Sequence, residues 1–345
     1  MTDMQTEEFN EYGQDTGQGN LLGIQPYMVP ADYASEATFF ARLDGCMQSA
    51  SRRGWLNERT IAVFPEYLGT WLVAAGESPQ VYRAPSMSAA MRALVLKHPL
   101  AFVGHFLSAR EPDRLKASLF RLKAEVMGSA YQAVFSRLAA QYRVTIVAGS
   151  ILLPAPQVIA GRVVAGQGPL QNVSAVYRPD GQAYPALARK TFPTSEELKF
   201  LAPAPLAGLP VFDTPAGRMG VLVCADAWYP APYARFKAAG VELIAVPIFG
   251  IATIWNATWE GYNGAPAPAD VDLTDVGRIT EGQANWKYAL AGRFCQSDAR
   301  YGINVCARGA IWDLGGNDCP AFMVSREKAI ETGRGKPAMN NLWLQ

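Results

Sequence analysis

Three residues whose side chains could act on a carbonyl carbon each follow a hydrophobic run of the chain. Glu66 stands in IAVFPEYLGTW, Lys190 in ALARKTFPT and Cys224 in RMGVLVCADAWYP. Nucleophilic attack on a carboxamide-like carbon needs a thiol, a base that takes its proton and a cation that holds the developing negative charge. The chain offers one residue for each task, and each stands where a buried strand is expected to end.

Each candidate has a chemical interpretation. Cys224 ends an apolar run just before a helix predicted to begin at Pro230, and that helix terminus and Lys190 would both lower the pKa of the thiol. The N–H of Ala225 is the natural oxyanion donor. Glu66 lies among aromatic residues, which would desolvate it and raise the pKa of its carboxyl toward that of a general base. Taken singly, each has a structural alternative: a core cysteine, an exposed turn glutamate and a solvated lysine.

Residues beside these motifs are candidates for supporting roles. Glu197, seven residues after Lys190, could orient the lysine or the substrate, with Glu196 or a plain helix face as alternatives. Four aromatic residues could line an apolar substrate pocket or belong to the core: Tyr67, Trp71, Trp228 and Tyr229. Residues 254–270 (IWNATWEGYNGAPAPAD) are predicted to form either a lid over the site or a subunit contact.

The apolar runs between the motifs indicate the elements that must position them. Buried strands are predicted at 21–28, 60–64, 144–154, 172–185 (a strand followed by a turn), 219–224, 241–249 and 301–309. Helices are predicted around 39–47 and at 113–142, 230–240 and 284–300. Strand, helix and strand over 219–249 form a βαβ unit, so the sheet is expected to be partly parallel. Residues 262–278 are predicted to be a long loop, and the whole pattern is layered α/β.

Composition excludes several other classes of protein. The 345 residues are half hydrophobic, and 31 basic residues nearly balance 30 acidic ones without a long basic run, which gives nucleic-acid binding little support. No apolar stretch reaches the roughly 20 residues of a membrane span. We therefore expect a cytoplasmic protein with neither a nucleic acid nor a membrane as partner.

The cysteines and histidines constrain the chemistry further. Five widely spaced cysteines without a C-x-x-C pair indicate free thiols in a reducing compartment. The chain has only two histidines, His98 and His105, which makes a zinc site or a Ser-His-Asp triad improbable. No G-x-G-x-x-G follows a strand, which argues against a Rossmann enzyme.

We expect one catalytic domain over residues 20–328, preceded by a disordered polar tail over 1–19. A C-terminal tail over 329–345 would follow it. The apolar end of that tail, NLWLQ (341–345), could pack across a subunit interface or fold back on its own chain.

The ordered motifs resemble those of the nitrilase or carbon–nitrogen hydrolase superfamily. The resemblance rests on FPEYLG, RKTFPT with Glu197, and VLVCADAWYP, and it extends from about residue 21 to about residue 325. It implies an αββα sandwich, with two mixed sheets packed face to face and helices outside. It also implies Cys224 as nucleophile, Glu66 as general base and Lys190 as oxyanion stabiliser. A homodimer or larger homo-oligomer and the absence of any cofactor or metal are further implications.

The motifs point to two branches of that superfamily. The spacing from Lys190 through Pro-Thr to Glu197 resembles nitrilases, whereas Asp226 two residues after Cys224 resembles amidases and carbamoylases. The expected reaction is hydrolysis of an amide, an N-carbamoyl compound or a nitrile through a thioester or thioimidate on Cys224. Two alternatives are an N-acyltransferase using the same thioester and a non-catalytic assembly protein on the same fold.

Overall fold

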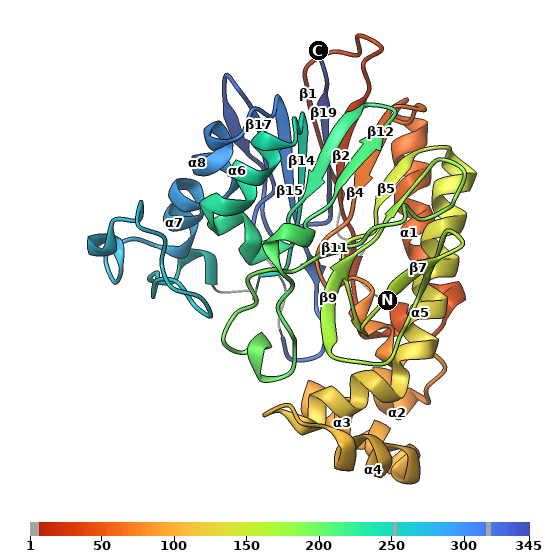
Figure 1. The fold of residues 1–345 in the computed structure, drawn as a ribbon. Helices are drawn as coiled ribbons and strands as arrows, with labels where there is room; N and C mark the ends of the chain where they lie inside the picture. The colour runs from red at the N-terminus through yellow and green to blue at the C-terminus, as the bar shows by residue number, and fades with distance from the viewer. Residues whose placement is uncertain (1–6, 251–253, 315–318) are drawn as a thin grey trace.

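The computed structural model describes residues 7–250, 254–314 and 319–345, and its centre is a pair of six-stranded sheets packed face to face (Figure 1). The first sheet has the order β1-β19-β2-β4-β5-β10. Its strands are β1 (Glu8–Tyr12), β19 (Ala338–Trp343), β2 (Asn20–Gln25), β4 (Thr60–Val63), β5 (Thr145–Val147) and β10 (Val176–Tyr177). Because β2, β4 and β5 run parallel and β10 antiparallel to β5, the sheet is mixed.

The second sheet has the order β12-β13-β14-β15-β17-β18 and is also mixed. Its strands are β12 (Val211–Thr214), β13 (Gly217–Val221), β14 (Leu243–Ile248), β15 (Tyr301–Cys306), β17 (Phe322–Ser325) and β18 (Ala329–Glu331). The parallel pair β13 and β14 flanks α6 (Pro230–Ala238), which confirms the predicted βαβ unit. Three short strands form a small separate sheet: β11 (Ala188–Arg189), β9 (Leu170–Ser174) and β6 (Ile151–Pro154). Two-stranded ribbons join β3 (Tyr27–Met28) to β16 (Arg308–Gly309) and β7 (Gln157–Ile159) to β8 (Arg162–Val164).

Alternation along the strands builds the layers. Ile61 and Val63 of β4 pack in the core between the sheets, whereas Ala62 and Phe64 pack on the other side, in the core under α1 (Glu36–Arg52) and α5 (Arg114–Tyr142). Strand β14 alternates in the same way, with its outer residues packed in the core beneath α6 and α8 (Leu290–Arg293). The result is the expected αββα sandwich.

Both ends of the chain belong to this sandwich, so the predicted tails need correction. Residues 8–12 are not disordered: they form β1, which pairs in parallel with β19, while residues 1–6 lie outside the described residues. The segment 329–345 is no separate tail, because it supplies β18 and β19. Its apolar end folds back on its own chain, where Leu342, Trp343 and Leu344 are buried. Strand β19 was not predicted because it contains polar residues. One of them, Asn340, is buried and donates a hydrogen bond from its Nδ2 to Oε1 of Gln25 at 2.9 Å.

Several predicted elements divide in the structure, among them the strands predicted at 21–28 (β2 and β3) and 301–309 (β15 and β16). The run 144–154 becomes β5 and β6 in different sheets, because the chain turns at Gly149, where φ is 62° and a Cβ would collide with the carbonyl of Pro65. The helix predicted at 284–300 is α7 (Glu281–Tyr288), α8 and a 3₁₀ turn. The helix predicted at 113–142 is confirmed as the unbroken α5. Three helices were not predicted: α2 (Pro79–Tyr82), α3 (Met87–Lys97) and α4 (Pro99–Ser108).

The prediction of five free thiols is wrong for two of them. Cys306 and Cys319 form a disulfide with their Cα atoms 6.1 Å apart. The pair forms because Cys306 ends β15 and Cys319 stands just before the neighbouring antiparallel strand β17. Cys46, Cys224 and Cys295 are free, so the cysteine pattern gives less support to a reducing compartment than expected. No helix of the described residues is both long and apolar enough to cross a membrane.

Candidate active site

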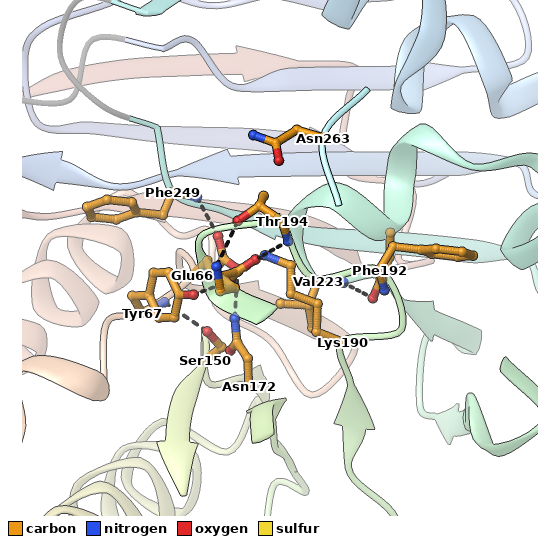
Figure 2. Close-up of polar contacts among 12 residues, drawn as sticks. Glu66, Tyr67, Ser150, Asn172, Lys190, Phe192, Thr194, Val223, Phe249 and Asn263 are labelled. Carbon is orange, nitrogen blue, oxygen red and sulfur yellow. Dashed lines mark hydrogen bonds and ion pairs between the residues drawn. The ribbon is translucent and has the colours of Figure 1, made fainter. Parts of the chain in front are cut away.

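Glu66 stands three residues after the end of β4 and is almost fully buried, with 1% of its surface exposed. Its Oε1 accepts hydrogen bonds from Nδ2 of Asn172 at 2.8 Å and from Nζ of Lys190 at 2.9 Å. Its Oε2 accepts one from the backbone N–H of Phe249 at 3.0 Å. Figure 2 shows these donors converging on the carboxylate from different parts of the chain. Burial raises the pKa of Glu66 more than Lys190 lowers it.

Lys190 directly follows β11 and lies between two carboxylates. Its Nζ is 2.9 Å from Oε1 of Glu66 and 2.8 Å from Oε1 of Glu197, and its backbone N–H donates to the carbonyl of Asn172. Burial alone would lower the pKa of Lys190, but the two carboxylates outweigh burial and hold the pKa well above its ordinary value. The site therefore contains a permanent buried cation.

Glu197 begins the 3₁₀ turn Glu197–Lys199 and is buried. One oxygen accepts from Lys190 and from the hydroxyl of Tyr67, and the other accepts from the backbone N–H of Thr194 at 2.8 Å. Burial raises the pKa of Glu197, but Lys190 and these hydrogen bonds together lower it by more than burial raises it. The pKa therefore lies below its ordinary value. The contacts place Glu197, rather than Glu196, beside the lysine.

Cys224 is the third residue after β13 and opens the 3₁₀ turn Cys224–Trp228. Its backbone is left-handed, with φ of 51°, which is uncommon for a residue other than glycine and typical of functional turns. The thiol hydrogen-bonds to the Glu66 carboxylate, and the charge of Lys190 acts on it. The three candidates therefore meet, although they come from three different sheets.

The expected thiolate is not supported. Desolvation and the negative charge of Glu66 raise the pKa of Cys224, and Lys190 lowers it by less, so the pKa is well above its ordinary value. The thiol thus carries its proton at rest, and its reaction depends on a neighbouring base. Sequence reasoning counted the lysine but missed the opposing charge of Glu66 on the thiol.

Asp226 connects the lysine loop to the cysteine turn. Its Oδ1 accepts from the backbone N–H groups of Thr191 at 2.9 Å and Phe192 at 2.8 Å, and its Oδ2 accepts from that of Val223 at 3.2 Å. It is fully buried, and burial raises its pKa to about 7. The sequence used this residue only as a marker of branch, whereas the structure shows it fixing the segment after Lys190 against the turn that holds Cys224.

Ala225 is the second residue of the turn that Cys224 opens, and it is partly exposed. The first N–H groups of a helical turn have no partner within the turn. The position is compatible with the oxyanion role expected for its N–H, and that role stays a prediction.

The four predicted substrate-binding aromatics separate into two groups. Tyr67 and Trp71 contact each other and Phe249 beside the Glu66 carboxylate, and Trp71 also contacts Trp312. The Tyr67 ring centre lies 6.0 Å from Nζ of Lys190. These two rings are therefore placed to line one side of the site.

Trp228 and Tyr229 make their ring contacts elsewhere. Tyr229 stacks on Phe192 with ring centres 3.8 Å apart, and Trp228 stacks on Trp259. Both also contact Tyr262, whose hydroxyl donates to the carbonyl of Trp228 at 2.8 Å. Their contacts thus anchor the segment 254–270.

That segment packs on its own chain beside the site. The hydroxyl of Tyr229 donates to the carbonyl of Ala265 at 3.2 Å, and Oδ1 of Asn263 accepts from the N–H of Ser195 at 2.9 Å. Figure 2 places Asn263 next to Thr194, over the lysine loop. This arrangement favours the lid among the two expectations for these residues.

Two groups in the site were missed from the sequence. Asn172 is buried on β9 and binds Glu66, while its own Oδ1 is buried without a hydrogen-bond partner. A polar side chain inside an apolar strand was the available signal for it. The Phe249 N–H left no signal, since almost every residue carries that donor. No group of three or more metal-ligating side chains was found among the described residues.

Comparison with known proteins assigns the chain to a family. The carbon–nitrogen hydrolase family profile matches residues 33–268, and the chain belongs to this family. A stretch of 87 residues is 40% identical to deaminated glutathione amidase of Yersinia enterocolitica. This stretch covers 24% of the chain and 30% of that relative's length.

Solved structures share the fold at low sequence identity. An amidase from Nesterenkonia sp. is 14% identical with a TM-score of 0.52, over 94% of this chain and 90% of that one. Saccharomyces cerevisiae Nit3, from the nitrilase superfamily, is 14% identical with a TM-score of 0.55, over 94% and 89%. At this identity the likeness establishes the fold alone.

Proposed function

We propose that this protein hydrolyses a non-peptide C–N bond, in an amide or an N-carbamoyl compound, through a thioester on Cys224. One observation carries the proposal: a thiol, a carboxylate and a buried ammonium meet at one site. Glu66 and Lys190 are 2.9 Å apart, and both act on the thiol. A scaffold protein has no need of such an arrangement, since buried charges are costly to hold.

In the first half-reaction, Sγ of Cys224 attacks the substrate carbonyl carbon while Glu66 takes the thiol proton. The carbonyl oxygen becomes an oxyanion, held by the ammonium of Lys190 and the N–H of Ala225. The C–N bond then breaks as the oxyanion collapses, and Glu66 gives its proton to the departing nitrogen. Ammonia or an amine leaves, and the acyl group remains on sulfur as a thioester.

In the second half-reaction, the same glutamate activates water. Glu66 takes a proton from the water, the oxygen attacks the thioester carbon and the C–S bond breaks. The sulfur recovers the proton from Glu66, and the acid is released. The hydrogen bonds from Phe249 and Asn172 hold the carboxylate in one orientation through both steps.

The raised pKa of the thiol supports this mechanism over a resting thiolate. A neutral thiol must lose its proton as it attacks, and the adjacent Glu66 is the acceptor. The raised pKa of Glu66 makes it a better base than an ordinary carboxylate, and it stays close to Lys190, which balances its charge.

Relatives give the proposal a chemical precedent. In a structure of a glutamate-to-glutamine mutant of the Nesterenkonia amidase, the acetamide moiety of fluoroacetamide is covalently added at the active-site cysteine. The Yersinia relative is named as an amidase. A nitrile would enter through the same attack and form a thioimidate. We favour amides and carbamoyl compounds because Asp226 occupies the second position after the cysteine.

The test is loss of substrate, followed by mass spectrometry, from a pool of amides, N-carbamoyl compounds and nitriles. Wild type is compared with Cys224→Ala and with Cys295→Ala, in which an exposed free cysteine is removed. Loss with wild type and Cys295→Ala, and none with Cys224→Ala, supports the proposal, and the class that disappears identifies the branch. Equal loss with Cys224→Ala would overturn it.

An acyltransferase using the same thioester is the second candidate. Residues 254–270 pack like a lid beside the site, and a lid that limits access of water to the thioester favours acyl transfer over hydrolysis. Adding an amine to the pool distinguishes the two: hydrolysis yields the acid, whereas acyl transfer yields the N-acyl amine. A non-catalytic assembly protein would retain its interactions in Cys224→Ala.

A further inference from the structure

The two helices α3 and α4 present large apolar side chains to solvent. Figure 1 shows these helices beneath the sandwich, at the edge of the molecule. The exposed side chains are Leu96 (80%), Leu100 (89%), Val103 (50%) and Leu107 (73%). A single exposed apolar side chain needs no explanation. Four large apolar side chains within twelve residues form an apolar surface that usually marks an interaction site.

The exposed residues of α4 form one stripe. Leu100, Val103 and Leu107 are spaced i, i+3 and i+7, which places them on one face of the helix. Phe102 on the opposite face is buried against the body of the protein. A helix at the surface of a globular protein normally turns polar residues outward, and α4 instead turns apolar ones.

The helices are attached firmly to the domain. Val81, Ala90, Leu94 and Phe102 are buried in the same core cluster as the site residue Trp71. The outward stripe is therefore held in place by a packed inner face.

The two helices carry basic but no acidic residues, and the acidic residues that flank them are paired: Glu77 with Lys97, Glu111 with Arg121 and Asp113 with Lys116. The segment from Ser78 to Arg110 contains four basic residues and no acidic one. Lys97 pairs with the buried Glu77 at 2.8 Å. Arg83, Arg92 and Arg110 are exposed, and none of them forms an ion pair within the part of the chain that the structure describes. Since the whole chain has 31 basic and 30 acidic residues, the remainder is net acidic.

We propose that α3 and α4 dock on an anionic lipid surface. An amphipathic element that combines an apolar stripe with arginines and lacks acidic residues matches the interface of such a bilayer, where leucines enter the acyl boundary and arginines contact the headgroups. No spanning helix is required. The proposal goes beyond the proposed hydrolysis and replaces our expectation of no membrane partner, which rested on the absence of a span.

A second copy of the chain fits this surface less well. A two-fold contact through the stripe would set the same patch against itself and bring the arginines of each copy toward those of the other. Like charges facing one another across an interface oppose association. A lipid surface of opposite charge has no such conflict.

Flotation with vesicles tests the proposal on the full chain. The probes are vesicles of phosphatidylcholine alone and of phosphatidylcholine mixed with phosphatidylglycerol. We expect binding to the mixed vesicles, weaker binding to the neutral ones, and a decline with added salt. Absence of binding to the mixed vesicles would overturn the proposal.

Two double variants separate the apolar and charged contributions. Leu100→Ser with Leu107→Ser should lower the partition coefficient about tenfold or more, and Arg92→Gln with Arg110→Gln should lower it about tenfold and weaken its salt dependence. Leu273→Ser is the matched control, because Leu273 is 65% exposed on a different part of the surface. All three change exposed residues, so their melting temperatures should match that of wild type.

Two further outcomes would also overturn the proposal. One is wild-type partitioning by the Leu100→Ser and Leu107→Ser variant. The other is a dimer in solution that this variant converts to a monomer without any binding of vesicles by wild type, which would assign the stripe to a second copy.

Discussion

The backbone N–H of Phe249 donates a hydrogen bond to Oε2 of Glu66, and this contact joins the two large sheets at the site. Glu66 follows β4 of the first sheet, and Phe249 follows β14 of the second. The carboxylate is thus oriented from the opposite sheet, while Lys190 and Asn172 hold its other oxygen. The position of the proposed general base therefore depends on how the two sheets pack.

Glu66→Gln should retain the fold and lose turnover. The glutamine oxygen can still accept the Phe249 N–H, but it cannot take a proton, so we expect kcat/KM to fall about 10²-fold to 10⁴-fold. Steady-state kinetics on the substrate found from the pool measure this. Glu196→Gln is the matched control, since Glu196 is exposed and forms its ion pair with the exposed Lys199. Activity of Glu66→Gln within a few-fold of wild type would contradict the assignment.

The same variant should lower the pKa of the Cys224 thiol, followed as the midpoint of its labelling by iodoacetamide in a pH series. The charge of Glu66 raises the pKa of the thiol, and Lys190 lowers it, so removing the carboxylate charge increases the thiolate fraction. Peptide mass spectrometry gives the rate of labelling, with exposed Cys295 as an internal standard. Cys46 is buried with its pKa raised to about 12, and Cys306 and Cys319 are bonded. A labelling midpoint of Cys224 that is unchanged or higher in Glu66→Gln, with Cys295 unchanged, would contradict this electrostatic account.

The pH dependence of kcat/KM should show a single acidic limb. Burial raises the pKa of Glu66 above 4.5, and activity should fall as pH drops through that raised pKa. The pKa values of Cys224 and Lys190 lie well above 9.0 and 10.5, so neither should produce a fall between neutrality and about pH 9.

Asn172→Leu tests the origin of that limb. It removes a hydrogen bond that stabilises the Glu66 carboxylate, so the limb should move to higher pH. Profiles of wild type and variant from about pH 4 to about pH 10 measure the shift. A uniform loss of activity with an unmoved limb would assign Asn172 a purely structural role.

Lys190→Met should destabilise the protein by about 3–5 kcal/mol near neutral pH, because it leaves two buried carboxylates without their cation. Without the lysine, the native pKa values of Glu66 and Glu197 rise above their unfolded values. The native state then binds more protons than the unfolded state, so the lost stability should return as pH falls toward the unfolded pKa values.

Urea unfolding at several pH values measures this effect. Lys199→Met is the control, because Lys199 is exposed in its pair with Glu196 and should contribute less than about 1 kcal/mol. A loss for Lys190→Met that is independent of pH would mean that packing, rather than charge, accounts for it.

The sequence predicted the part of the site that strand ends define. Glu66, Lys190 and Cys224 each follow an apolar run, and buried strands bring such positions together. Asn172 and Phe249 act through contacts between distant segments, which no local pattern records. Trp228 and Tyr229 are neighbours of Cys224 in sequence, yet their rings pack toward Phe192, Trp259 and Tyr262.

The fold was predictable where hydrophobic periodicity was clear, as in α5 and β14. It was missed where the pattern was weak for a physical reason. Helix α4 has apolar residues on its buried side as well as in its exposed stripe, so its sequence lacks the polar face that marks a surface helix. Strands β1 and β19 contain polar residues whose partners lie at the other end of the chain, as Asn10 and Asn340 do.

Strand β19 lies between β1 and β2 in the first sheet. A ribosome makes β2 at residues 20–25 and β19 only at residues 338–343. At a rate of synthesis of about 5–20 residues per second, the edge of β2 that pairs with β19 stays unpaired for on the order of tens of seconds. During synthesis the growing chain therefore exposes an unpaired strand edge, which could pair with the strand of another chain until β19 is made.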